Sequence, residues 1–289
     1  SIKDQNFFLF CFANFFLGVG MSFTHQYRFA AAESVEKNKI PKAISIILLG
    51  GIVSAFMGPG IANYAKDIVG EHLYVGSYLA LGILTIIPTI FFLFYKNTSK
   101  IESKIKYSGR SRLELISQPR FLQALVASAF GYAIMTFLMT ATPLSMHVME
   151  KMSLSKTGLV IQFHVVAMFL PSLVTGYLIK KFGHSNIMYA GVFLYSITIA
   201  ASFFDQTFFN YMFALIFLGL GWNFLFISGT SLLILTYKED EKFRAQGLND
   251  FIVYSVHAIG SLSAGVLIAL TNWKTMNIIC IPLMVLIIL

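Results

Sequence analysis

Long stretches without Asp, Glu, Lys or Arg run through this 289-residue chain and limit what it can fold into. An α-helix needs about 20 apolar residues to cross the roughly 30 Å hydrocarbon core of a bilayer. Nine stretches approach this length, one of them interrupted by Asp250 and the last reaching Leu289: residues 5–27, 43–65, 72–95, part of 121–149, 157–179, 182–204, part of 206–237, about 245–270, and about 277–289. The sequence therefore predicts an all-α polytopic membrane protein with about nine transmembrane helices.

The composition supports a chain that has lipid as its solvent. Hydrophobic residues make up 57% of the chain and charged residues 12%, whereas soluble domains carry about 25% charged residues. The net charge is +8, which in a soluble protein would suggest a nucleic-acid partner. In a membrane protein, basic residues instead collect in cytoplasmic loops, so no nucleic-acid binding is expected. Cys11 and Cys280 lie in apolar runs, and neither a disulfide, a metal site nor a cofactor is predicted.

The distribution of the 21 basic residues predicts the orientation. If the connection from Arg28 to Lys42 and residues 96–120 are cytoplasmic, together with every second connecting segment after them, 16 basic residues lie inside and five lie outside. The five outside residues are Lys3, Lys66, Lys151, Lys156 and Lys274. The longest polar segment then separates three helices from six.

An internal repeat predicts the architecture. Three matches occur in the same order: Leu17–Phe23 with Leu218–Phe224 at an offset of 201, then Lys42-Ala43 with Arg244-Ala245 and Gly58 with Gly260 at an offset of 202. The repeat predicts a twelve-helix protein in two six-helix halves, with three helices expected before Ser1. The expected divisions are 1–96 for the remainder of the first bundle, 97–119 for a cytoplasmic linker, and 120–289 for the second bundle.

This arrangement resembles the major facilitator superfamily. Three motifs carry the resemblance: Gly50-Gly51 followed by Gly58-Pro59-Gly60, the loop Gly176–Gly183, and Gly18 with Gly20 after Asn14. The chain departs from the family pattern at Lys180, where an acid is usual, and at Asn14, where an arginine is usual. Tyr27–Ala31 and His164–Ser172 also resemble a bacterial branch near which riboflavin importers belong.

A small-residue face in 43–65 predicts close helix packing. Gly50, Ser54, Gly58 and Ala62 recur every four residues, and Pro59 can bend the helix. We expect this face to lie against 157–179. It is consistent with rocking of one bundle against the other, and equally with ordinary tight packing.

Polar residues inside predicted spans are candidates for function. Asp250, with Asn249 beside it, is a candidate gate or coupling acid; the family resemblance places its basic partner in a loop before Ser1. Lys181 and Arg244 are further gating candidates. The candidates for the substrate cavity are Asn14, Tyr132, Thr136, Gln162, His164, Trp222, Asn223 and His257. For the two histidines, a packing role is an alternative.

The predicted function is secondary active transport of a small organic solute by alternating access, ion- or proton-coupled or facilitative. The expected setting is a bacterial inner membrane, with a monomer in the lipid bilayer. The sequence carries no Gly-Lys-Ser/Thr phosphate loop, no His-Glu-x-x-His and no Cys-x-x-Cys. An intramembrane enzyme and a non-transporting scaffold are the alternatives, and both are disfavoured because repeats of this kind serve alternating access.

Overall fold

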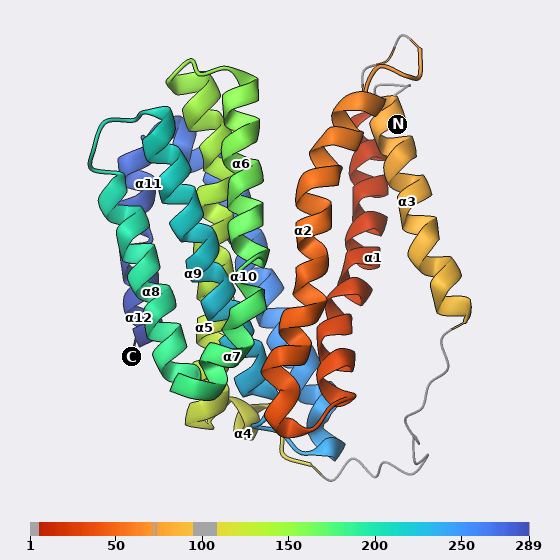
Figure 1. Cartoon of the computed structure of the whole chain (residues 1–289), viewed down its shortest axis with the longest axis vertical. Helices are drawn as coiled ribbons and strands as arrows, with labels where there is room; N and C mark the ends of the chain where they lie inside the picture. Colours follow the sequence, from red (N-terminus) through yellow and green to blue (C-terminus); the bar gives the residue numbers. More distant parts are fainter. Residues whose placement is uncertain (1–5, 71, 73, 95–108, 289) are drawn as a thin grey trace. The chain divides into compact units, whose positions relative to one another are not determined.

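The computed structural model describes residues 6–70, 72, 74–94 and 109–288, apart from the side chains of residues 59, 63, 89, 91 and 92. The described chain is all-helical (Figure 1). Its α-helices are α1 (Phe7–Glu33), α2 (Ile40–Ala65), α3 (Val75–Leu93), α4 (Arg112–Ile116), α5 (Pro119–Pro143), α6 (Leu154–Phe169), α7 (Ser172–Phe182), α8 (His184–Ala201), α9 (Phe208–Ile234), α10 (Lys242–Leu270), α11 (Trp273–Ile279) and α12 (Ile281–Ile288). Short 3-10 turns are η1 (Lys37–Lys39) and η3 (Glu239–Glu241), and η2 (Leu144–Met149) is a π-helical turn.

The helices fall where the charge-free stretches predicted them, which confirms the all-α class. Five described helices are long and apolar enough to cross a membrane: α1, the described part of α2, α5 with η2, α9, and α10 with η3. The pair α6–α7, bent by 40° at a short break, would make a sixth. The described part of α3 and the α11–α12 pair are shorter, and α8 begins with the polar His184, Ser185 and Asn186.

The described chain divides into two compact units, Ser1–Tyr27 with Val53–Lys106 and Arg28–Ile52 with Tyr107–Leu289. In the first unit, α3 packs against the end of α2. Ser77 Oγ donates a hydrogen bond of 2.6 Å to the Ala62 carbonyl, and the rings of Phe10 and Tyr78 lie 5.8 Å apart. Part of the predicted linker 97–119 lies outside the described residues; its described part contains α4.

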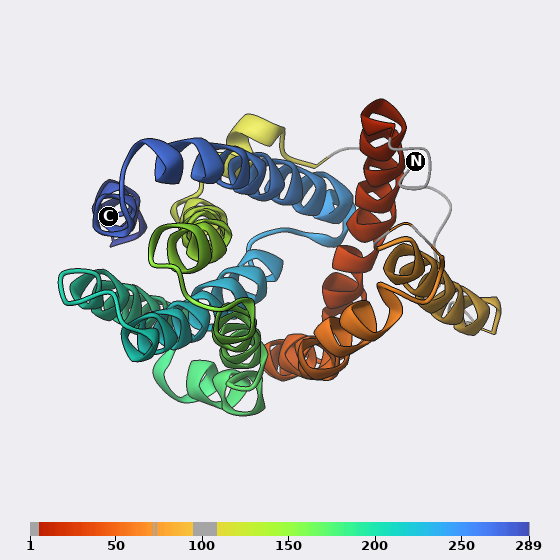
Figure 2. The ribbon, with the colours of Figure 1, turned by 90° about the horizontal axis from the view of Figure 1, so that it is seen from above.

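In the second unit, α9 is the central helix (Figure 2). It packs against α5, α6 and α8, while α10 packs against α5. Small residues allow this approach: a Cβ added at Gly219 would lie 2.7 Å from the His164 carbonyl oxygen, and one at Gly221 would lie 2.8 Å from that of Gly191. Polar bonds join the same helices, including Tyr195 Oη to the Gly131 carbonyl at 2.7 Å.

The first part of α2 lies against α6 and α7, the helices that fill the predicted span 157–179. A Cβ added at Gly176 of α7 would lie 3.0 Å from the Lys42 backbone, and one at Gly51 would meet the Phe169 ring. Gly50 takes no part, because a Cβ there would meet nothing within 4 Å. The expected approach of the two helices therefore occurs, but Gly51 and Lys42, rather than Gly50, form the contact. Ala62 contacts α3 instead, and the side chain of Pro59 lies outside the described residues.

Candidate substrate and gating site

A buried ion pair joins the end of α1 to α10. Arg28 Nη2 bonds Asp250 Oδ1, and only 3% of the Arg28 side chain and 10% of the Asp250 side chain are exposed. Asn249 Nδ2 donates to the same carboxylate oxygen at 3.0 Å, and Arg28 Nη1 donates to the Tyr254 hydroxyl at 3.4 Å. A carboxylate in an apolar interior needs such neighbours, because an isolated buried charge is very costly.

The pair corrects one expectation about Asp250. The sequence prediction placed its basic partner in a loop that lies outside this chain, whereas Arg28 supplies the charge from within it. Sequence reasoning counted Arg28 only as a basic residue of the inside segment. One feature could have identified it: Arg28 directly follows a 23-residue span, and the chain holds one carboxylate well inside a predicted span that needs a cation.

An aromatic cluster lies beside this ion pair. We define it as Tyr132, Phe169, Trp222, Phe226, Tyr254 and His257. Trp222 and Phe226 stack at 4.9 Å with planes 13° apart, and the His257 ring lies 4.6 Å from Tyr132. The guanidinium of Arg28 sits 4.7 Å from the Phe226 centroid, which places the cluster and the pair in one continuous set of contacts.

The aromatic cluster combines a buried base with a partly open face. Trp222 and Phe226 are buried, whereas Tyr132, Phe169, Tyr254 and His257 are half-buried. The Trp222 Nε1 donor is buried and has no hydrogen-bond partner among the described residues. Buried indole N–H groups usually find a partner, so an unpaired one is a candidate contact for a ligand. The arrangement can stack against a planar ring and offer it a hydrogen bond.

His164 lies on α6, five residues before Phe169 of the aromatic cluster. It is fully buried, and its Nδ1 lies 2.7 Å from the Leu215 carbonyl, while Nε2 has no partner in the described part of the chain. The ring is therefore anchored on one side to α9. A packing role and a ligand contact, the two alternatives left by the sequence, can both use this geometry.

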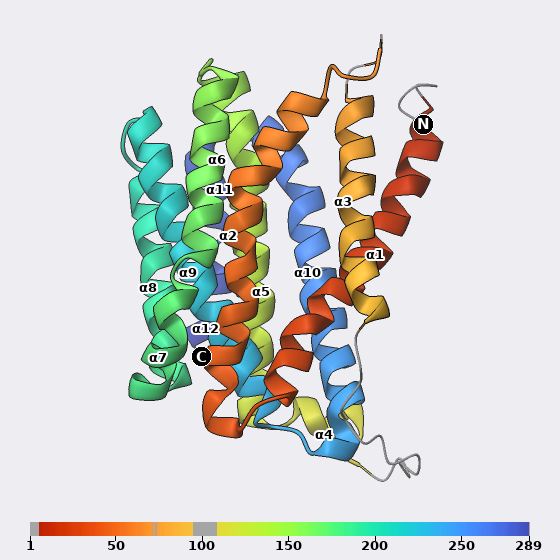
Figure 3. The same ribbon diagram turned by 45° about the vertical axis from the view of Figure 1, so that its right-hand side comes forward.

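The side-chain amide of Asn223 makes its hydrogen bonds to other residues of the protein. Its Nδ2 donates to the Met168 carbonyl at 2.7 Å and to Ser172 Oγ at 2.8 Å, and its Oδ1 accepts from Thr175 at 2.6 Å. Met168 and Ser172 flank the break between α6 and α7. In an unbroken α-helix the Met168 carbonyl would accept a hydrogen bond from the backbone N–H of Ser172, four residues later. Figure 3 shows α7 following α6 across this bend. The contacts favour a structural role over the predicted contact with substrate.

Asn223→Ala is therefore expected to lower the stability of the protein by about 2 kcal/mol or more, because buried polar groups at the break lose their partner. Thermal unfolding of the detergent-purified protein measures this. Asn186→Ala is the matched control, since Asn186 is exposed and bonds only locally to the Phe182 carbonyl. Unchanged unfolding with reduced solute uptake would restore the substrate role of Asn223.

A second polar cluster fixes the segment before α5 to the α9–α10 connection. The Glu241 carboxylate is 1% exposed and accepts bonds from Arg110 Nε at 2.7 Å, from the Arg110 backbone N–H at 2.9 Å and from the Lys238 backbone N–H at 2.9 Å. The hydrogen bond and charge of Glu241 raise the pKa of Arg110. Arg244, predicted as a gating residue, donates to the Gly109 carbonyl at 3.1 Å and so belongs to this polar cluster.

The other predicted site residues are not members of the aromatic cluster. Asn14 is in the first unit, exposed, and donates to the Phe10 carbonyl of its own helix. Thr136 is buried on α5, and Gln162 is half-buried on α6. Lys181 is exposed at the end of α7, with its ammonium 5.1 Å from the Phe182 centroid. Within the described residues, no group of three His, Cys, Asp or Glu side chains could hold a metal ion.

Comparison with known proteins gives matches across most of the chain. Residues 141–289 match the family described as Major Facilitator Superfamily. The chain is 36% identical over 291 residues to the riboflavin transporter RfnT of Brucella anthropi, covering 99% of this chain and 72% of that protein. It is 28% identical to the uncharacterized MFS-type transporter YddS of Bacillus subtilis, covering 90% of this chain and 64% of that protein.

A solved structure gives an independent match of fold. The crystal structure of a bacterial homologue of the iron transporter ferroportin, in an outward-facing state, superposes with a TM-score of 0.64. The match covers 89% of this chain and 64% of that one, at 16% sequence identity. At this identity the likeness concerns the fold alone.

Proposed function

Because the chain belongs to the major facilitator superfamily and is a multi-pass integral membrane protein, we propose that it carries a small planar organic solute of the riboflavin type across a bacterial inner membrane by alternating access. Membership of a transporter family sets aside the intramembrane enzyme. The observation that carries the substrate class is the aromatic cluster beside a buried ion pair.

The chemistry of the aromatic cluster suits a flavin-like ring. A tricyclic heteroaromatic solute offers a large π-face, and rings of Tyr, Trp and His stack on such faces with a useful gain in free energy. Trp222 Nε1 adds a donor for an acceptor at the edge of the solute. The relative that is named as a riboflavin transporter supports the same substrate class.

The ion pair supplies a gate in this proposal. Tyr254 belongs to the aromatic cluster and also accepts a hydrogen bond from Arg28, so a solute that moves Tyr254 also disturbs the Arg28–Asp250 pair. Movement of α1 relative to α10 would break the pair, and its re-formation would close the pathway. Coupling to an ion and facilitated movement are both compatible with this gate.

We also propose nine membrane crossings, with residues 29–42 and 96–120 cytoplasmic; of these, residues 96–108 lie outside the described part of the chain. The contacts of the second unit support a shared end for the basic segments. Lys242 lies 3.5 Å from Glu33, Arg110 bonds Glu241, and Arg120 donates to Ser185 at 3.0 Å. Segments that lie at one end of a helical unit share one side of the membrane, and excess Lys and Arg mark that side as cytoplasmic.

Uptake of radiolabelled riboflavin tests the function. Cells without their own riboflavin uptake that express the protein are expected to accumulate riboflavin with saturable kinetics. Tyr132→Leu and His257→Ala are each expected to raise KM about tenfold, since loss of a stacking ring costs about 1–3 kcal/mol. Tyr189→Leu is the control, because Tyr189 is exposed on α8 and 46% accessible.

Two outcomes would overturn parts of this proposal. Absence of saturable riboflavin uptake, with the protein present in the membrane, would remove the proposed substrate class. Saturable uptake with an unchanged KM in both variants would show that the aromatic cluster serves packing rather than binding.

A further inference from the structure

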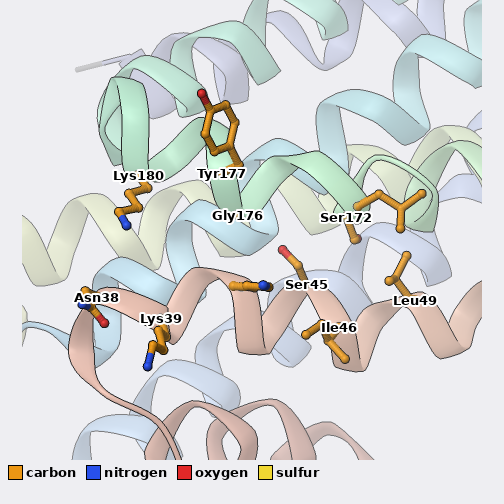
Figure 4. A pocket seen from close by; sticks show the side chains of 11 residues that line it. Asn38, Lys39, Ser45, Ile46, Leu49, Ser172, Gly176, Tyr177 and Lys180 are labelled. Atoms are coloured by element: carbon orange, nitrogen blue, oxygen red, sulfur yellow. The ribbon is translucent and has the colours of Figure 1, made fainter.

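A pocket of about 560 Å³ opens between the first part of α2 and α7, separate from the aromatic cluster (Figure 4). Where the two helices meet, the backbones of Gly176 and Lys42 are in close contact. The lining of the pocket combines three lysines, Lys39, Lys42 and Lys180, with exposed apolar side chains. The function proposed above uses none of these residues, so the pocket needs an account of its own.

The charge of the pocket is positive and mostly unbalanced. Lys39 lies 3.2 Å from Glu36 in an exposed pair, which water screens. Lys42 and Lys180 have no carboxylate within 4.0 Å among the described side chains. Two exposed ammonium groups that face one pocket from different helices attract an anion.

A buried hydroxyl gives a second, independent observation. Ser45 is 2% exposed, and its Oγ has no hydrogen-bond partner in the described structure. Figure 4 shows Ser45 pointing from α2 toward α7, between the lysines and the apolar part of the pocket. A buried polar group without a partner costs free energy, so an occupant that accepts its hydrogen bond would remove that cost.

The apolar part of the lining decides what kind of anion fits. Ile46, Leu173 and Tyr177 are 56%, 65% and 64% exposed and continue from the basic end along the two helices. A free inorganic anion gains nothing from such side chains, whereas an amphipathic one buries its hydrocarbon there. Basic pockets between membrane helices at the cytoplasmic side suit lipid headgroups, and the lysines lie in segments with the predicted cytoplasmic charge bias.

We propose that this pocket binds an anionic phospholipid, with Lys42 and Lys180 beside the headgroup phosphate and Ser45 donating a hydrogen bond to it. The acyl chains lie along the exposed apolar residues of α2 and α7. The bound lipid bridges the two helices at the point where their backbones are closest, so it strengthens the packing of α2 on α7.

Binding of phosphatidylglycerol to the delipidated, detergent-purified protein tests the proposal, with native mass spectrometry and thermal unfolding as readouts. Phosphatidylglycerol is expected to bind and to raise the unfolding temperature, and phosphatidylcholine to bind more weakly. The double variant K42Q/K180Q is expected to bind about tenfold more weakly or worse, since each lysine near an anionic lipid contributes about 1 kcal/mol. Ser45→Ala is expected to weaken binding severalfold while it keeps the fold, because it removes an unpaired hydroxyl.

The control variant is K151Q/K156Q, which removes the same charge from exposed positions outside the pocket. Equal binding by K42Q/K180Q and this control would overturn the proposal. Equal stabilisation by phosphatidylcholine would also overturn it. If millimolar inorganic phosphate displaces the lipid completely from the wild type, the site is one for free phosphate and the lipid assignment is wrong.

Discussion

Arg28→Ala is expected to abolish solute uptake and to lower stability by about 3–5 kcal/mol, because the buried Asp250 carboxylate would lose the Arg28 guanidinium. Asp250→Ala is expected to act similarly, since it leaves the guanidinium buried among Phe29 and Phe226. Uptake by expressing cells and thermal unfolding of the purified protein measure the two effects. Lys156→Ala, which changes an exposed cation, is the control.

A hydrophobic replacement of the whole pair separates stability from gating. Buried ion pairs replaced by apolar residues of similar volume often keep or gain stability. R28M/D250L is therefore expected to regain most of the unfolding temperature and still fail to transport. If this variant transports at the wild-type rate, the Arg28–Asp250 pair is structural, and the proposed gate is wrong.

Arg110→Ala is expected to lower stability by about 2–3 kcal/mol, because the buried Glu241 carboxylate would lose charge-assisted hydrogen bonds from the guanidinium. Two backbone N–H donors, from Arg110 and Lys238, would remain. Glu241 is also the acceptor that fixes the segment before α5 to η3, so the loss is expected to loosen that connection. Limited proteolysis near residue 110 and thermal unfolding measure both effects.

The conservative variant Arg110→Lys is a control for the geometry of the Arg110 contact. Arg110→Lys keeps the charge but cannot present the two-pronged guanidinium, so it is expected to recover only part of the stability. Arg112→Ala changes an exposed arginine two residues away and is expected to have little effect. Equal unfolding temperatures for the wild type and Arg110→Ala would show that Glu241 needs no cation, against the present interpretation.

Much of the fold could be predicted from one physical requirement. A backbone in hydrocarbon must satisfy its hydrogen bonds internally, so long uncharged stretches become helices, and the helices lie where those stretches were found. The motifs around Gly50, Gly58 and Gly176 pointed to the family, which the matches confirm. Local signals of this kind need no knowledge of which helices touch.

The candidate site could be predicted only in part. The position of a polar residue within a span gives its depth in the membrane, but not which neighbouring helix its side chain faces. Position within a predicted span marks Asp250 as a charge that needs partners, and Asn249 does donate a hydrogen bond to it, but the cation comes from Arg28 and not from an earlier loop. In the sequence His257, Trp222 and Tyr132 are separate candidates, and packing brings them into one aromatic cluster. Asn223 is an equally plausible cavity residue in the sequence, but in the structure its side-chain amide donates hydrogen bonds at the break between α6 and α7.

The sequence by itself determined that this protein lies in a lipid bilayer, that it is helical, where its helices lie and to which family it belongs. All four depend on composition and on spacing along the chain. Tertiary structure decided the partner of Asp250, the use of Asn223, and the lysine pocket between α2 and α7. These features join residues about 50 to 220 positions apart, and a helix that is apolar on all sides carries no periodic pattern to show which face meets a neighbour.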